Sequence, residues 1–281
     1  MAKRRAAVVA LAAVAIGGCG EGSGPPALPN PVSDAGVQHI HGLGINPADR
    51  SLVIATHTGL FRVASDERTA QRIGDRRQDT MGFTVVGADR FLGSGHPDAR
   101  EDLPPLLGLI SSDDAGSTWQ PVSLLGEADF HVLRAAERRI YGYDATEDRL
   151  LVSEDSGRSW SERSPPAPVL DLAIDPRDAA RVVVTSEAGL YMSGDAGATW
   201  RPLPDAAPGL LAWTDGLVLV DGSGAVWRST DSGRLFRTAG RIGGQPAALS
   251  SDGDDLYVAL HDNTVKLSDD GGRSWSVRVR G

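Results

Sequence analysis

The sequence predicts an all-β protein, a single six-bladed β-propeller. An eight-residue motif recurs five times, and successive copies start 41, 40, 36 and 39 residues apart. This spacing is the length of one four-stranded blade and is typical of propellers. Short alternating apolar stretches bounded by Gly and polar turns lie between the copies, as expected for strands. Each copy has Ser first, Asp third, Gly fifth and Trp or Phe eighth, and the copies start at Ser112, Ser153, Ser193, Ser229 and Ser268.

The order of residues in the motif has a physical reason. The Asp side chain accepts hydrogen bonds from backbone N–H groups just ahead of it, and Gly takes up a positive φ without steric cost. The closing aromatic ring buries a large apolar surface. We therefore expect each copy to form a structural turn between the third and fourth strands of a blade.

These copies resemble the BNR or Asp-box repeat of the sialidase superfamily, which also occurs in other glycoside hydrolases, sortilin-type receptors and a photosystem assembly factor. In those families the repeat belongs to the scaffold. The resemblance therefore implies a propeller and does not by itself imply an activity.

Six units can be laid end to end, and a seven-bladed ring is the less favoured alternative. The first unit lacks the motif, but its segment 54–62 has the same order of strand, turn and strand as the other units. The last unit ends in its own outer strand, 275–280, so we expect the ring to close by packing between the first and last blades. The units are 37–79, 80–126, 127–167, 168–207, 208–244 and 245–281.

The N-terminus has the features of a lipoprotein signal peptide, predicted to cover residues 1–18. Basic residues 3–5 precede an apolar segment, 6–16, that is too short for a comfortable membrane span. Cys19 follows in a sequence that resembles a bacterial lipobox; an ordinary secretory signal is the alternative. Because Cys19 is the one cysteine of the chain, we predict its lipidation, an extracytoplasmic location, and membrane contact through the lipid anchor only.

Residues 19–36 are rich in Gly, Ser and Pro and are predicted to form a flexible tether, with the propeller domain over 37–281. Removal of residues 1–18 leaves 25 basic against 37 acidic side chains, a net charge of −12. Such a charge disfavours binding to nucleic acid or anionic headgroups. A single thiol also excludes an internal disulfide.

The six histidines map to one rim of the predicted ring. Within a blade, the start of the first strand and the end of the second share a rim, and the recurring turn lies on the opposite rim. Histidines open the first strands of blades one and three and close the second strands of blades one, two and six. They are His39, His41, His57, His96, His131 and His261.

This convergence predicts a ligand site, with copper or zinc as the expected metal and a polar ligand as the alternative. Imidazole, carboxylate and thioether groups are ligands of such metals, and Met81 opens the first strand of blade two on the same rim. His39 and His41 are two residues apart, so on a regular strand they would project from one face.

A second hypothesis is a glycoside hydrolase that binds a glycan, as the sialidase resemblance implies. Such chemistry needs two carboxylates, or a Tyr activated by an acid, beside the scissile bond. The candidates near this rim are Tyr143, Asp144 and Glu187. The Arg-Ile-Pro signature usual in sialidases is absent.

A third hypothesis is a non-catalytic interaction or assembly scaffold. The apolar insertion 103–107 in blade two offers a surface that docks a partner or covers the mouth. The sequence does not identify the protein partner.

Overall fold

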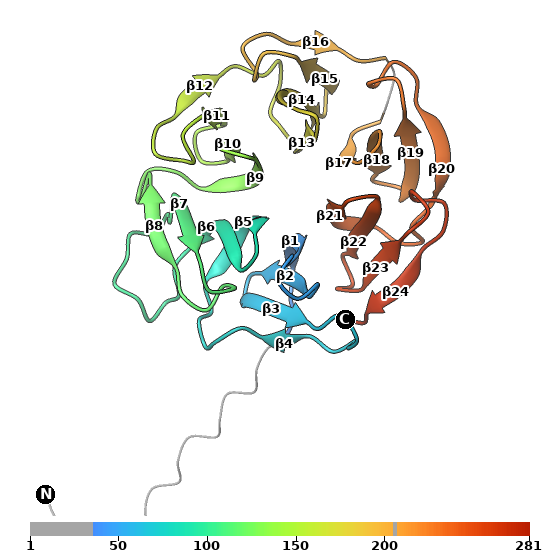
Figure 1. Cartoon of the computed structure of the whole chain (residues 1–281). Coiled ribbons are helices and arrows are strands. Elements are labelled where there is room, and N and C mark those ends of the chain that lie inside the picture. The colour runs from blue at the N-terminus through green and yellow to red at the C-terminus, as the bar shows by residue number, and fades with distance from the viewer. Residues whose placement is uncertain (1–35, 205–206) are drawn as a thin grey trace, which may run out of the picture. The chain divides into compact units, whose positions relative to one another are not determined.

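The computed structural model describes residues 36–204 and 207–281, and within these ranges it contains β-strands and no helix. In the described chain, 24 strands form six four-stranded sheets that surround a central opening as blades (Figure 1). The predicted six-bladed propeller is therefore confirmed. The predicted signal peptide, Cys19 and all but the last residue of the predicted tether lie outside the described residues. No candidate transmembrane helix is found in the described ranges.

Each blade is a meander of four consecutive antiparallel strands, numbered outward from the centre of the ring. Blade one has β1 Ile40–Ile45, β2 Leu52–Thr56, β3 Gly59–Val63 and β4 Gln71–Arg72; blade two has β5 Asp79–Gly87, β6 Arg90–His96, β7 Leu109–Ser112 and β8 Gln120–Ser123; blade three has β9 Phe130–Ala136, β10 Arg139–Asp144, β11 Arg149–Ser153 and β12 Ser161–Arg163; blade four has β13 Asp171–Asp175, β14 Asp178–Ser186, β15 Gly189–Ser193 and β16 Arg201–Pro202; blade five has β17 Gly209–Trp213, β18 Leu217–Asp221, β19 Ala225–Ser229 and β20 Arg237–Arg241; blade six has β21 Pro246–Asp252, β22 Asp255–Leu260, β23 Val265–Ser268 and β24 Ser276–Val279.

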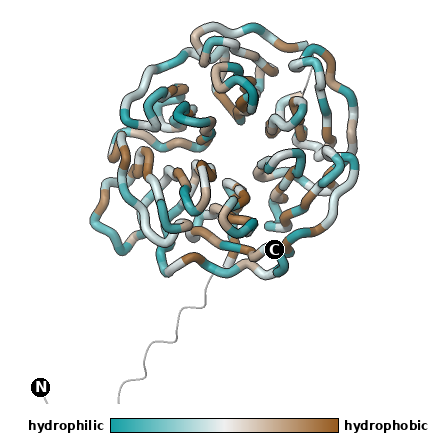
Figure 2. Tube along the Cα trace, viewed as in Figure 1, coloured by the Kyte–Doolittle hydropathy of each residue, from teal (hydrophilic) through white to brown (hydrophobic). Residues whose placement is uncertain are grey.

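The core is divided into six apolar clusters, one at each junction between neighbouring blades. The second strands contribute most strongly, because each is covered on both faces; β2 and β18 are buried along their whole length. Outer strands such as β12 and β20 are largely exposed. Figure 2 shows the result as apolar segments in every blade, separated by hydrophilic turns.

The five recurring turns join the third and fourth strands of blades two to six, as predicted. In each turn the backbone N–H of the motif Gly donates to the Oγ of the motif Ser, for example Gly157 to Ser153 at 2.8 Å. The Ser hydroxyl in turn donates to the Asp carboxylate. The Gly φ of about +85° at position 157 is the left-handed conformation that favours glycine. In blade three the turn is also bonded to the first hairpin, since Ser156 N donates to Arg138 O at 2.9 Å.

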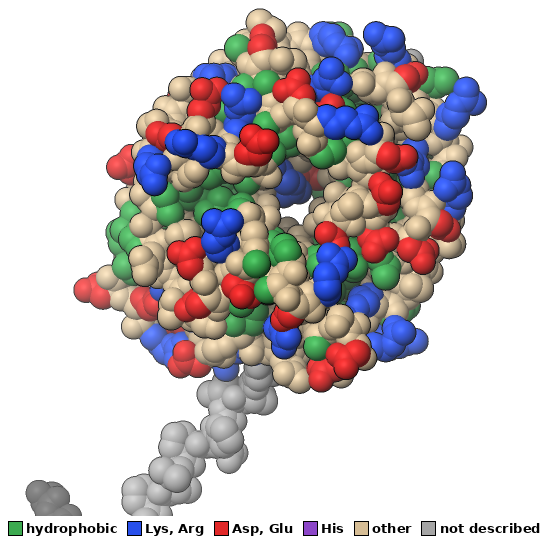
Figure 3. All heavy atoms as spheres, viewed as in Figure 1, with side chains coloured by type: hydrophobic (Ala, Val, Ile, Leu, Met, Phe, Trp, Pro, Cys, Tyr) green, Lys and Arg blue, Asp and Glu red, His purple; other side chains and the backbone are tan. Residues whose placement is uncertain are grey.

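These turns therefore lie on the rim where first strands end, which is opposite the rim where they begin. In Figure 3, acidic and basic side chains are interspersed around the central opening, and no histidine is visible on the face shown. The predicted separation of the recurring turns from the histidines agrees with this topology.

The ring closes by packing between blades one and six, and among the described residues no sheet combines strands of these two blades. One apolar cluster spans this junction, with Ile54 and Phe61 from blade one and Tyr257 and Val265 from blade six all buried. Hydrophobic burial at this seam replaces the strand exchange by which a ring can also be closed.

Polar contacts reinforce the seam at its outer edge. The Arg278 guanidinium on β24 donates to the backbone carbonyls of Ala64, Ser65 and Glu67 in blade one. In the reverse direction, Arg68 Nη1 donates to Val277 O at 2.7 Å.

Replacing Arg278 by Ala is expected to lower the free energy of unfolding by about 2 kcal/mol, because hydrogen bonds from a charged donor contribute about 1.5–3 kcal/mol. Urea unfolding followed by tryptophan fluorescence measures the change. Arg280→Ala is the matched control, since Arg280 is exposed at the same chain end. Equal stability of the Arg278 and Arg280 variants would show that the outer contacts do not hold the ring closed.

Candidate metal centre

Three β-bulges place side chains at the mouth of the central channel. The register of the first strand shifts at the same point in blades one, two and three, and the extra residues are His41, Met81 and His131. A bulge turns one side chain out of the regular alternation, and bulges often occur beside functional sites. All three residues line the channel, a cavity of about 600 Å³ whose wall is built from the first strands of all six blades.

Three histidines of blade one meet at this mouth. The His57 ring lies between the other two, with its centroid 4.4 Å from that of His41 and 5.0 Å from that of His39, both edge to face. His57 follows the end of β2. His39 and His41 belong to the opening of β1, so the antiparallel pairing of β1 and β2 brings the three rings together.

The expected projection of His39 and His41 from one face of a regular strand is not what the structure shows. His39 precedes β1 and has a φ of +49°, and His41 occupies the bulge. The two rings converge on His57 because of these two irregularities. Backbone irregularity of this kind is concentrated at functional sites in proteins.

Asp79, the first residue of β5, completes the cluster from blade two. Its Oδ2 lies 2.6 Å from His57 Nδ1, and its Oδ1 lies 3.7 Å from His41 Nε2. One ligand atom from each of these three residues lies within 4.8 Å of the other two.

Two facing atoms of this cluster have no hydrogen-bond partner. His41 Nε2 and Asp79 Oδ1 are both buried and unpaired, although buried polar atoms are nearly always paired in native proteins. Nitrogen and oxygen ligands that share a metal ion at 2.0–2.2 Å lie roughly 3–4 Å apart. A cation between the two atoms would therefore satisfy both.

The protonation state of His41 suits metal binding. Burial, and secondarily the neighbouring His57, lower the pKa of His41 to about 4, while Asp79 opposes the shift. His41 is consequently neutral at pH 7, which leaves a ring nitrogen with a lone pair available as a ligand.

His96 and His131 meet at a second carboxylate, that of Asp129. Asp129 Oδ2 lies 2.9 Å from His131 Nε2 and 3.4 Å from His96 Nε2. The hydrogen bond from the imidazole to Asp129 raises the pKa of His131.

His261 stands apart from this group. It follows β22 in blade six and is exposed. Within the described ranges, no ring contact or ion pair joins it to the other five histidines.

Asp79 and Asp129 were not among the residues predicted from the sequence. A spacing signal was present: an ionisable residue stands two positions before each bulge residue, giving the pairs 39/41, 79/81 and 129/131. Aspartate at the start of a strand is also common in ordinary turns, so the residue type alone did not mark these positions.

The three candidates for glycoside hydrolysis lie in different environments. The Asp144 carboxylate is fully buried and accepts hydrogen bonds from Asp129 N, Thr146 and Arg149. Burial and the contact with Asp148 raise the pKa of Tyr143 to about 12, which opposes its use as a nucleophile. Glu187 lies exposed in the β14–β15 turn of the next blade.

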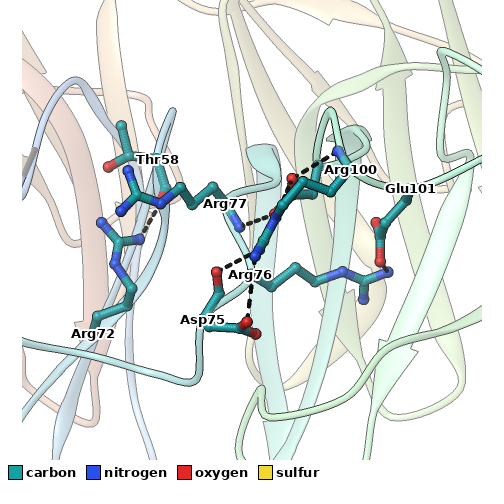
Figure 4. Close-up of polar contacts among 8 residues, drawn as sticks. Thr58, Arg72, Asp75, Arg76, Arg77, Arg100 and Glu101 are labelled. Carbon is teal, nitrogen blue, oxygen red and sulfur yellow. Dashed lines mark hydrogen bonds and ion pairs between the residues drawn. The ribbon is translucent and has the colours of Figure 1, made fainter. Parts of the chain in front are cut away.

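A twelve-residue insertion borders the mouth at blade two, between β6 and β7. It is held by Asp98, which is nearly buried and accepts hydrogen bonds from Arg77 N at 2.7 Å and Arg100 Nη2 at 2.6 Å. Figure 4 shows Arg77 and Arg100 in this network, together with the pair Arg76–Glu101. Because this network joins the insertion to the segment just before Asp79, it fixes the wall beside the histidines.

Comparison with solved structures supports the fold. The chain is similar to YCF48 in a complex with a D1 peptide (TM-score 0.55, 12% identity, 86% of this chain and 83% of that chain). It is also similar to a GH74 xyloglucanase from Xanthomonas campestris (TM-score 0.57, 18% identity, 86% and 45%) and to a chain of a nidogen/laminin complex (TM-score 0.62, 14% identity, 78% and 89%). At these identities the likeness concerns the fold alone. No family model and no curated protein matches the chain.

The low pKa of His41 predicts a pH-dependent stability of the metal-free protein. The unfolded imidazole has a pKa near 6.5, so between pH 6.5 and 4 the unfolded chain binds the proton that folded His41 does not. The contribution of His41 to stability should be complete above pH 6.5 and decline as the pH falls toward 4. NMR titration of the histidine rings, assigned with His41→Gln, measures the folded-state pKa of His41 that sets this range. A His41 midpoint near 6.5 would contradict the prediction.

Proposed function

We propose that this protein binds a divalent transition-metal ion at the mouth of its propeller channel, through His41, His57 and Asp79, with His39 beside them. The observation that supports this most directly is the pair of unpaired, buried atoms, His41 Nε2 and Asp79 Oδ1, which face each other at 3.7 Å. A positive ion between them supplies the partner that each lacks.

The ligand set favours zinc or copper. Imidazole nitrogen suits zinc, copper and nickel, and a carboxylate oxygen is a frequent third ligand of zinc. Histidine and aspartate side chains must be deprotonated to hold a metal ion, so metal uptake would release protons. His41, His57 and Asp79 would supply three protein ligands, the number typical of catalytic zinc sites.

The cellular setting forms part of the proposal. The lipobox-like sequence at Cys19 supports a bacterial lipoprotein exposed outside the cytoplasm, and the recurring turns support an Asp-box propeller of the sialidase superfamily. In this setting the propeller is a rigid, membrane-anchored carrier of the metal centre.

The alternatives have less support from the geometry. For glycoside hydrolysis, the Asp144 carboxylate is buried and hydrogen-bonded, and the raised pKa of Tyr143 opposes its use as a nucleophile. A scaffold function rests on the insertion 103–107, where Leu103 is 40% exposed, and this observation does not specify a partner.

Metal binding can be tested on the full-length chain, purified in detergent without a histidine tag and stripped with a chelator. Isothermal titration with Zn²⁺, and separately with Cu²⁺, should show binding that Asp79→Asn and His41→Gln each weaken at least tenfold, since even ligand-supporting residues contribute about 10–100-fold. His261→Gln is the matched control and should bind as the wild type does. Equal affinity of the Asp79→Asn variant and the wild type for the metal ion would refute the proposed site.

A further inference from the structure

The arrangement of His57 and Asp79 is repeated one blade further around the ring. In the first pair, the residue that closes the second strand of blade one meets the carboxylate that opens the first strand of blade two. His96 and Asp129 stand in the same relation between blades two and three. The repeat therefore places a second imidazole–carboxylate pair at the next blade junction of the same rim.

We propose that His96, Asp129 and His131 form a second divalent transition-metal site, so that the mouth holds two metal ions. This inference rests on the proposed function, because it extends the same chemistry to the neighbouring junction. Each site takes two imidazoles and one carboxylate from two neighbouring blades. The second group is more open than the first: both imidazoles lie near Asp129 Oδ2, but only the first group among the described residues has all its ligand atoms within 4.8 Å of one another.

Asp129 has the properties of a ligand residue. Its side chain is 4% exposed, and two ring nitrogens approach the same oxygen, Oδ2. Its other oxygen, Oδ1, is buried without a hydrogen-bond partner. A buried carboxylate with an unpaired oxygen is costly unless a positive charge lies beside it.

His96 is oriented as a metal ligand. Its Nδ1 lies 2.8 Å from Pro105 O, and because a carbonyl only accepts hydrogen bonds, Nδ1 must carry the proton. In the neutral ring, Nε2 then has a lone pair that points toward the Asp129 carboxylate. Metal-binding histidines commonly donate their other N–H to a backbone carbonyl in this way.

The blade-two insertion therefore serves the second site directly. Pro105 belongs to this insertion, and Leu107 N donates to Gly95 O at 2.9 Å, one residue before His96. The Asp98–Arg100 contacts hold the base of the same segment. No other blade has a connection of this length between its second and third strands in the described chain.

The stoichiometry of zinc binding tests the second site. Full-length protein, free of tag and metal, is dialysed to equilibrium against increasing Zn²⁺, and bound zinc is measured by elemental analysis. We expect two zinc ions in the wild type, and one in Asp129→Asn, His96→Gln and Asp79→Asn at concentrations that saturate the wild type. The double variant Asp79→Asn/Asp129→Asn should bind none, and His261→Gln should bind two.

Folding is checked by near-ultraviolet circular dichroism and thermal melting. If the buried Asp129→Asn change prevents folding, His96→Gln alone tests the site, because the His96 side chain is 43% exposed. Two zinc ions in a folded His96→Gln variant, or one zinc ion in the wild type that Asp79→Asn removes, would overturn the second site. In the latter case the first site stands, whereas a wild type without bound zinc would overturn both.

Discussion

Burial of apolar surface between neighbouring blades is the interaction on which the whole ring depends. Each of the six apolar clusters belongs to a junction, so a blade has no complete core of its own and needs both neighbours. The candidate ligands also lie at junctions: Asp79 faces histidines from blade one, and Asp129 faces His96 from blade two. The distances among these side chains are consequently set by how the blades pack, and the closing contact between blades six and one keeps that packing in place.

The bulges interrupt this regular scaffold at the mouth of the channel. An ordinary first strand would alternate its side chains between the two blade junctions, but His41, Met81 and His131 stand at register shifts and reach the channel. The corresponding pairing in blades four and five is regular there. A repeat protein can thus confine chemistry to one part of its ring by small local changes that leave the repeat intact.

Much of the fold could be predicted, because a turn motif at blade-length spacing indicates both the order of the strands and the rim on which each strand begins or ends. That topology also placed His41, His57, His96 and His131 at one mouth before any distance was known. The bulges could not be predicted, since register depends on the partner strand and not on the local sequence. Asp79 and Asp129 were missed for a related reason: a carboxylate at the start of a strand becomes distinctive only when a histidine from the preceding blade lies against it. His261 shares the offset of His57 and His96, but blade six has Ala247 at the bulge and offers no second imidazole.

The side chains at the starts of the first strands give the mouth two chemical halves. Imidazoles and a thioether line it at blades one to three, whereas Leu170, Leu210 and Ala247 line the same cavity at blades four to six. Leu170 is 46% exposed, so the aliphatic half is open to solvent. A molecule lying across the opening would meet electron-pair donors at one end and hydrocarbon at the other. Amphiphilic compounds would fit such an entrance better than uniformly polar ones.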